Sequence, residues 1–126
     1  MSGKKYNPRV ASSTRYNRFV SKVRSRNDPC AICHHPIDYA LKSPDPLSFE
    51  ADHIVPVSKG GDEYDPANGQ AAHRCCNNWR KDKPMSYVDD VMAGLVKPRV
   101  EPPIWRNSEN KAPGANAPAV VPTFDW

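Results

Sequence analysis

The fold of this 126-residue chain is decided by two short segments, Cys30-Ala31-Ile32-Cys33 and His73-Arg74-Cys75-Cys76. Each segment offers two metal-binding side chains three positions apart, and together they supply the four thiolate and imidazole ligands of a tetrahedral structural zinc site. One Cys-x2-Cys pair would be weak evidence, because redox-active pairs share its spacing. The second pair favours zinc. The predicted ligands are Cys30, Cys33, His73 and Cys76, with Cys75 as a rival of Cys76 and with His34 and His35 as weaker rivals of His73.

The composition is that of a small domain that needs such a metal. Only 38% of the residues are hydrophobic and 14 are proline, so the chain has little apolar surface from which to build a core. Its first five residues are polar and lead into no apolar run, so we expect no signal peptide and a reducing, cytoplasmic setting in which cysteines bind metal rather than form disulfides. No segment approaches the roughly 20 apolar residues of a membrane span.

A second group of polar residues lies between the two zinc pairs. Residues 48–57 read Ser-Phe-Glu-Ala-Asp-His-Ile-Val-Pro-Val and predict a strand with Asp52 and His53 near its centre. The glycines 60–61 predict a turn, a short second strand follows Asn68, and a helix is expected from Cys76 or Asn77 to about residue 83. The four polar side chains of this group, Asp52, His53, Asn68 and Asn77, provide oxygen ligands and one imidazole. That set suits a harder ion than zinc.

The N-terminal region is strongly basic. Residues 1–27 contain eight lysines and arginines and no acid, which predicts either a surface that contacts nucleic-acid phosphates or a solvated, disordered tail. From Ser12 or Ser13 onward the spacing of the apolar residues predicts a helix with one apolar face that packs on the zinc domain. These apolar residues are Tyr16, Phe19, Val20 and Val23.

The C-terminal third is expected to hold one more helix and then little structure. Residues 87–96 predict a helix whose apolar stripe packs on the core, made of Val88, Val91, Met92 and Leu95. Six prolines follow from Pro98 onward, which predicts a flexible tail. The expected organisation is a disordered basic arm (1–11), a basic helix (12–27), the central domain with its C-terminal helix (28–97) and the tail (98–126).

These motifs resemble the HNH endonucleases of the ββα-metal type over roughly residues 28–84. The resemblance is carried by Cys30-x2-Cys33, Phe49-Glu50-Ala51-Asp52-His53-Ile54-Val55-Pro56, Gly60-Gly61, Asn68 and His73-Arg74-x-Cys76-Asn77. The sequence around Pro36 and Ser48 is similar to small HNH proteins encoded by tailed bacteriophages and by some actinobacterial genomes. The resemblance implies an α+β fold, a small zinc-stapled ββα-metal domain with flanking helices and disordered termini, and it favours Cys76 over Cys75 as a ligand. One departure is that Asn77 stands where a histidine is common, which favours Mg2+ or Mn2+.

The resemblance also implies a role for each polar residue. His53 would be the general base, Asp52 and Asn77 would hold one Mg2+ or Mn2+ ion, and Asn68 would orient His53 or brace the loop. Asp52 and His53 are neighbours on a strand and point to opposite faces, so they can share a site only where the strand ends or kinks. The residues expected to contact DNA are Arg15, Arg18, Lys22, Arg24, Arg26, Arg80 and Lys81.

Three functions compete at this point. The first is a metal-dependent DNA endonuclease, for which the resemblance to phage proteins implies a possible part in DNA packaging with terminase subunits. The second is a catalytically silent, zinc-stapled nucleic-acid-binding module. The third is an adaptor whose proline-rich tail recruits a partner. The grouping of Asp52, His53, Asn68 and Asn77 favours the endonuclease, because a binding module needs none of these four together.

Overall fold

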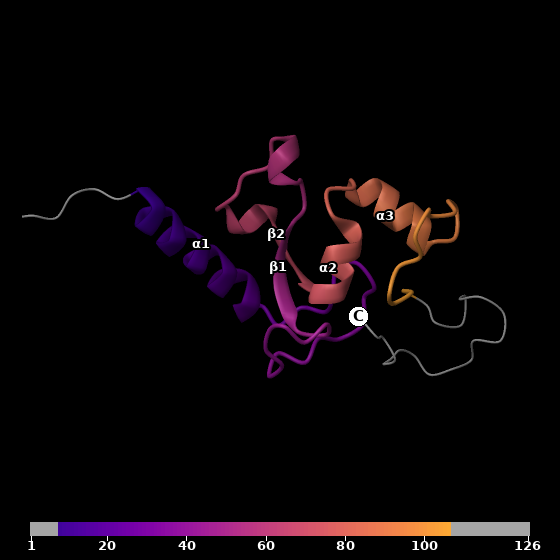
Figure 1. Ribbon diagram of the computed structural model, residues 1–126, viewed down its shortest axis with the longest axis horizontal. Coiled ribbons are helices and arrows are strands. Elements are labelled where there is room, and N and C mark those ends of the chain that lie inside the picture. The colour runs from indigo at the N-terminus through magenta and orange to yellow at the C-terminus, as the bar shows by residue number, and fades with distance from the viewer. Residues whose placement is uncertain (1–7, 107–126) are drawn as a thin grey trace, which may run out of the picture.

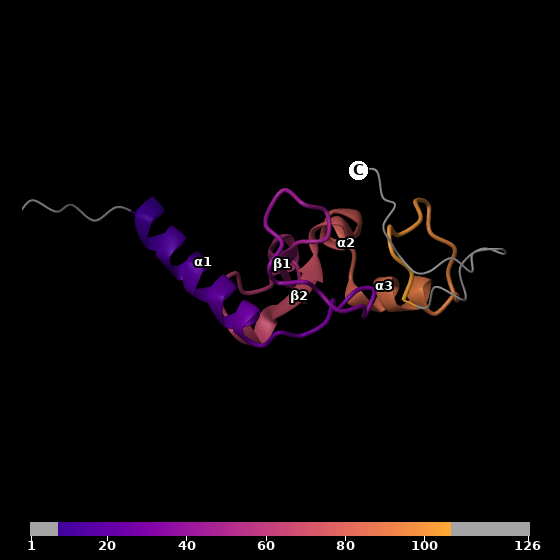
Figure 2. The same cartoon turned by 90° about the horizontal axis from the view of Figure 1, so that it is seen from below.

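The computed structural model describes residues 8–106, and it describes side chains from Ser13 onward. It is an α+β structure in which a two-stranded antiparallel sheet lies between the N-terminal helix on one side and the two later α-helices on the other (Figures 1 and 2), so the predicted fold class is confirmed. No helix in this part of the chain is long and apolar enough to cross a membrane. The elements are α1 (Pro8–Ser25), β1 (Phe49–His53), η1 (Val57–Lys59), η2 (Pro66–Asn68), β2 (Gly69–His73), α2 (Arg74–Arg80) and α3 (Met85–Met92).

The register of the hairpin places the two candidate sites at opposite ends. Phe49 pairs with His73 at the end where β2 passes directly into α2, and His53 pairs with Gly69 at the other end. The predicted zinc ligand His73 therefore lies at one end of the hairpin and the candidate base His53 at the other. Strand β1 is shorter than predicted and ends at His53. From Ile54 onward the backbone is instead held by Asn68.

The loop after β1 depends on a close approach of two backbone segments. A Cβ atom on Gly61 would lie 1.8 Å from the carbonyl oxygen of Val55 and 2.9 Å from the side-chain nitrogen of Asn68. Neither distance is possible for a real side chain, so glycine is required there. Gly60 adopts a left-handed conformation with φ of 94°, which glycine accepts without steric cost.

Helix α1 begins at Pro8, before the predicted start at Ser12. The predicted disordered arm is thus wrong for residues 8–11, and its residues 1–7 lie outside the described part of the chain. Two buried side chains, Phe19 and Val23, dock α1 on the hairpin, whereas Tyr16 is exposed. Tyr16 therefore does not belong to the buried face of α1, although the spacing of the apolar residues predicted that it would.

Helix α3 is also shorter than predicted. It ends at Met92, and the chain then turns at Gly94, whose φ is 80°. Val88, Val91 and Met92 are buried as predicted, but Leu95 lies beyond the helix and is 75% exposed. Leu95 is therefore not part of the core.

Residues 98–106 pack on the domain, so the predicted flexible tail is wrong for this stretch. The side chain of Ile104 is buried, and the indole nitrogen of Trp79 donates a hydrogen bond to the carbonyl oxygen of Val100 at 2.7 Å. The carbonyl oxygen of Trp105 lies 2.9 Å from His35 Nε2. The remaining tail, residues 107–126, lies outside the described part of the chain.

Candidate metal centre and nuclease site

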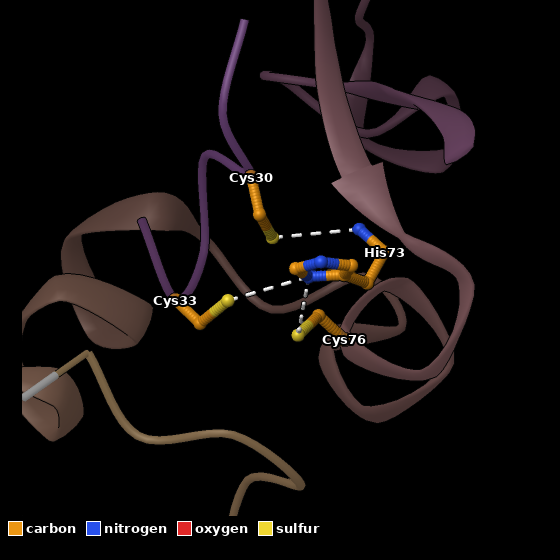
Figure 3. A group of neighbouring side chains, drawn as sticks. All are labelled: Cys30, Cys33, His73 and Cys76. Carbon is orange, nitrogen blue, oxygen red and sulfur yellow. Dashed lines mark hydrogen bonds between the residues drawn. The ribbon is translucent and has the colours of Figure 1, made fainter. Parts of the chain in front are cut away.

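The four predicted zinc ligands meet at one point in the structure (Figure 3). The ligand atoms of Cys30, Cys33, His73 and Cys76 all lie within 4.8 Å of one another, and all four side chains are buried. His73 Nδ1 is 3.3 Å from the sulfur of Cys33 and 3.9 Å from that of Cys76. Zinc bonds of about 2.3 Å to sulfur and about 2.0 Å to nitrogen would give separations of about 3.5 to 3.8 Å between ligands at the corners of a tetrahedron. The cluster thus fits a structural zinc ion.

The imidazole of His73 is oriented by a hydrogen bond at the ring nitrogen that faces away from the cysteines. Its Nε2 lies 3.1 Å from the carbonyl oxygen of Pro36. Because a carbonyl oxygen can only accept, Nε2 carries the proton and Nδ1 presents its lone pair to the cysteines. The backbone amide of Ala31 donates to the carbonyl oxygen of Ala71, which ties the Cys30–Cys33 turn to β2.

The three thiols influence one another strongly. Burial alone would raise the pKa of Cys30, but hydrogen bonds from Cys33 and Cys76 outweigh it and hold that pKa well below its usual value. The hydrogen bond to Cys30 in turn raises the pKa of Cys33, and hydrogen bonds to Cys30 and Cys33 raise that of Cys76. One thiolate is favoured and two more are opposed unless a cation neutralises them. A divalent ion that accepts sulfur ligands provides that charge.

The rival ligands lie elsewhere. Cys75 is buried, but it is not in the cluster, and its backbone amide donates to the carbonyl oxygen of Pro46. His34 is exposed, and His35 contacts the backbone of Trp105. The cluster thus brings Cys76 and His73, rather than these rivals, together with Cys30 and Cys33.

At the other end of the hairpin, Asp52 is a buried carboxylate with three partners. Its Oδ2 accepts hydrogen bonds from Arg80 at 2.7 Å and from Gln70 at 2.9 Å, and its Oδ1 accepts from the backbone amide of His53 at 2.8 Å. A carboxylate has about four lone-pair directions, so one direction on Oδ1 remains for a cation.

Arg80 is a structural residue, and its predicted contact with DNA is wrong. Its side chain is 0% exposed. It also donates to the carbonyl oxygens of His53, Ile54 and Lys83. These bonds fasten the end of β1 to α2. A guanidinium with no exposed surface cannot reach a phosphate.

Asn77 is joined to Glu50 rather than to Asp52. Its amide nitrogen donates to one oxygen of Glu50 at 2.9 Å, and Arg74 donates to the other oxygen at 2.9 Å. Within residues 8–106 no hydrogen bond links Asn77 to Asp52, although both lie where α2 meets β1. Asn77 and Glu50 also line a cavity of about 420 Å3 between α1 and β1. Sequence reasoning missed Glu50, although its position two residues before Asp52 on a strand was a usable signal.

His53 faces away from Asp52, as the alternation of a strand requires. Its Nε2 lies 3.0 Å from the carbonyl oxygen of Glu63, and its ring stacks on Phe19 with 4.8 Å between ring centroids and 6° between ring planes. The carbonyl accepts a hydrogen bond from the Nε2–H group, so in the neutral ring Nδ1 keeps its lone pair. No residue pattern in the sequence linked Phe19 to His53.

Asn68 braces the loop after β1. Its side-chain oxygen accepts from the amide of Val55 at 2.9 Å, and its nitrogen donates to the carbonyl oxygens of Val55 and Asp62 at 3.0 Å each. In the described part of the chain it has no hydrogen bond to His53. Of its two predicted roles, the geometry matches the bracing one.

The other predicted DNA contacts fall into two groups. Arg15, Arg18 and Lys22 are exposed on α1 and line a cavity of about 240 Å3, and Lys81 is exposed after α2. Arg24 and Arg26 are exposed as well, but they already donate to backbone carbonyl oxygens: Arg24 to Tyr39, and Arg26 to Pro66 and Gly69.

Comparison with protein families gives a match to part of the chain. The family model described as HNH endonuclease matches residues 30–83, which run from the first zinc ligand through the hairpin and α2. No curated protein and no solved structure matches the chain. HNH proteins are usually nucleases that act on DNA. The matched segment contains both ligand pairs and the ββα unit, and residues 30–83 of this chain therefore form a domain of the HNH endonuclease family.

Proposed function

We propose that this protein is a metal-dependent endonuclease that hydrolyses phosphodiester bonds in DNA, with His53 as its general base. The observation that carries the proposal is the orientation of the His53 imidazole. Its Nε2 is occupied by the carbonyl oxygen of Glu63 at 3.0 Å, which leaves Nδ1 able to accept a proton. The family match over residues 30–83 supports the reaction class.

In the proposed reaction a water oxygen attacks the phosphorus atom, and its proton moves to Nδ1 of His53. The bond between phosphorus and the 3′ oxygen breaks, and this oxygen takes a proton from solvent. Asp52 and Asn77 would hold one Mg2+ or Mn2+ ion, which would neutralise charge on the phosphate and assist the departing oxygen. Asp52 has one free lone-pair direction and Asn77 has a side-chain amide oxygen, and oxygen atoms of these kinds are the ligands that such an ion prefers.

DNA would be held by the exposed face of α1. Arg15, Arg18 and Lys22 line one cavity together with Phe19, whose ring touches His53. Cations placed there would bind backbone phosphates next to the base without reading sequence.

The resemblance to phage HNH proteins extends the proposal to DNA packaging in the host cytoplasm with terminase subunits. The residues that support this extension are those around Pro36 and Ser48. Co-purification of the tagged full chain with terminase subunits would test it.

A catalytically silent nucleic-acid-binding module is the second candidate. One observation favours it: Asp52 is already paired with Arg80 and Gln70, and its partner ligand Asn77 is bonded to Glu50. A binding module would bind DNA with strong salt dependence and would need no Mg2+.

A plasmid-nicking assay separates the two candidates. Zinc-loaded protein is incubated with supercoiled DNA in Mg2+, Mn2+ or EDTA, and His53→Asn is compared with His34→Asn. His34 is an exposed histidine with φ of 66°, a conformation that asparagine tolerates, so it is a matched control. The endonuclease proposal expects cutting with Mg2+ or Mn2+ that is lost in His53→Asn and kept in His34→Asn. DNA binding without cutting in any metal would favour the binding module.

A further inference from the structure

The geometry points to Phe19 as a positioning residue for His53, and this inference rests on the proposed function. The two rings are nearly parallel, with 6° between their planes and 4.8 Å between their centroids. Phe19 is 1% exposed, so its ring is fixed by its surroundings. One face of the imidazole therefore lies against a buried aromatic ring.

The hairpin leaves space for the Phe19 ring next to His53. Gly69 lies directly opposite His53 in the β1–β2 register. A Cβ atom on Gly69 would lie 2.8 Å from Phe19 Cε1 and 2.5 Å from Val23 Cγ2. Any side chain at position 69 would push α1 away. The absence of one lets the Phe19 ring reach the imidazole.

Two contacts then hold the imidazole in different directions. The carbonyl oxygen of Glu63 holds its edge, and Phe19 holds its face. Together they restrict rotation of the His53 side chain, so that Nδ1 keeps one direction. A base held in a productive orientation saves the entropy of finding it, and a misplacement of about 1 Å can cost roughly 100-fold in rate.

The Phe19 ring belongs to a helix outside the HNH domain. Helix α1 spans Pro8–Ser25, whereas the family match begins at residue 30. The same helix carries Arg15, Arg18 and Lys22 around the cavity that Phe19 also lines. Phe19 thereby couples the proposed phosphate-binding face to the base. DNA bound by α1 would lie at a set distance from His53.

The kinetic test compares Phe19→Leu with Val23→Ala in the full zinc-loaded chain. Both variants remove buried contacts between α1 and Gly69, but Phe19→Leu also removes the ring that stacks on His53. We expect Phe19→Leu to lower kcat on plasmid DNA by roughly 10- to 100-fold with little change in KM. Val23→Ala should keep the wild-type kcat, and so should Phe19→Tyr, because it retains the aromatic ring. Equal loss of kcat in Phe19→Leu and Val23→Ala would overturn the inference, because it would show that docking of α1 alone matters.

A second readout needs neither added metal nor DNA. Long-range 1H–15N spectra of the His53 ring should show a single Nε2–H tautomer in the wild-type protein, with ring protons shifted upfield by the Phe19 ring. In Phe19→Leu the upfield shift should vanish and both tautomers should appear. Unchanged spectra would overturn the inference whether or not the protein cuts DNA. Changed spectra in a protein that never cuts DNA would support the positioning contact and refute the nuclease proposal. If Phe19→Leu does not fold, Phe19→Met replaces it in both experiments.

Discussion

Arg80 Nη1 and Asp52 Oδ2 lie 2.7 Å apart, and both side chains are almost fully removed from solvent. The carboxylate proposed to bind the catalytic ion is therefore also half of a buried ion pair between α2 and β1. The arginine compensates the charge of Asp52 and, through its bonds to the carbonyl oxygens of His53 and Ile54, shapes the end of the strand. Structure and proposed catalysis share one network.

We predict that Arg80→Ala lowers the free energy of unfolding by about 3 to 5 kcal/mol, because it leaves the buried charge of Asp52 without the opposite charge that compensates it. Arg74→Ala is the matched control. Arg74 pairs with Glu50 at 2.9 Å but is partly exposed, so its removal should cost no more than about 1 kcal/mol. Urea denaturation of the zinc-loaded proteins measures both values. Equal effects of the two substitutions would contradict the burial of the Asp52–Arg80 pair.

Removal of zinc should unfold the domain, since the cluster joins the Cys30–Cys33 turn to the start of α2 and the core is small. We expect a chelator to abolish the helical circular dichroism signal. Cys33→Ser should lose zinc, measured as metal per chain by mass spectrometry, whereas Cys75→Ser should keep one ion. A chelated protein with an unchanged melting curve would refute the structural role of the ion.

Asn68→Ala should loosen the loop that follows β1, because it removes the two hydrogen bonds that the side chain donates to Val55 and Asp62 and the one that it accepts from Val55. The three bonds are exposed, so water can pair with the freed backbone groups, and the free energy of unfolding should fall by only about 1 kcal/mol. Hydrogen exchange at Val55 should accelerate, since its amide donates to the Asn68 side-chain oxygen that the substitution removes. Asn78→Ala, at an exposed position of α2, should change neither quantity. Slow exchange at Val55 in the Asn68 variant would count against the bracing role.

The basic face of α1 should dominate the salt dependence of DNA binding. Replacing Arg15, Arg18 and Lys22 together by glutamine should reduce the slope of log affinity against log salt by about 0.9 for each phosphate that the variant no longer neutralises. The control replaces three exposed cations elsewhere by glutamine, namely Lys42, Lys97 and Arg99. Fluorescence anisotropy with a short duplex, without Mg2+, gives both slopes. A larger change in the control would place the DNA surface elsewhere.

The sequence was sufficient for the zinc cluster and the ββα fold. Ligand type and spacing indicate a tetrahedral zinc site, and the family resemblance favours Cys76 over its rival Cys75, which gives the cluster Cys30, Cys33, His73 and Cys76. Alternation along the strand also predicted that Asp52 and His53 face opposite sides. These properties depend on residues close together in the chain or on the chemistry of one ion, so they can be read without coordinates.

Tertiary structure decided how each side chain is used. Arg80 was expected on the surface and is buried, because Asp52 and two carbonyl oxygens accept its hydrogen bonds across the packed interface of α2 with β1. The tail beyond Pro98 was expected to be flexible, yet Ile104 packs in the core. Phe19 stacks on His53 only because Gly69 leaves space between them. Each of these contacts joins residues that are distant in the sequence, and no local pattern of charge or hydrophobicity records which distant partner a side chain meets.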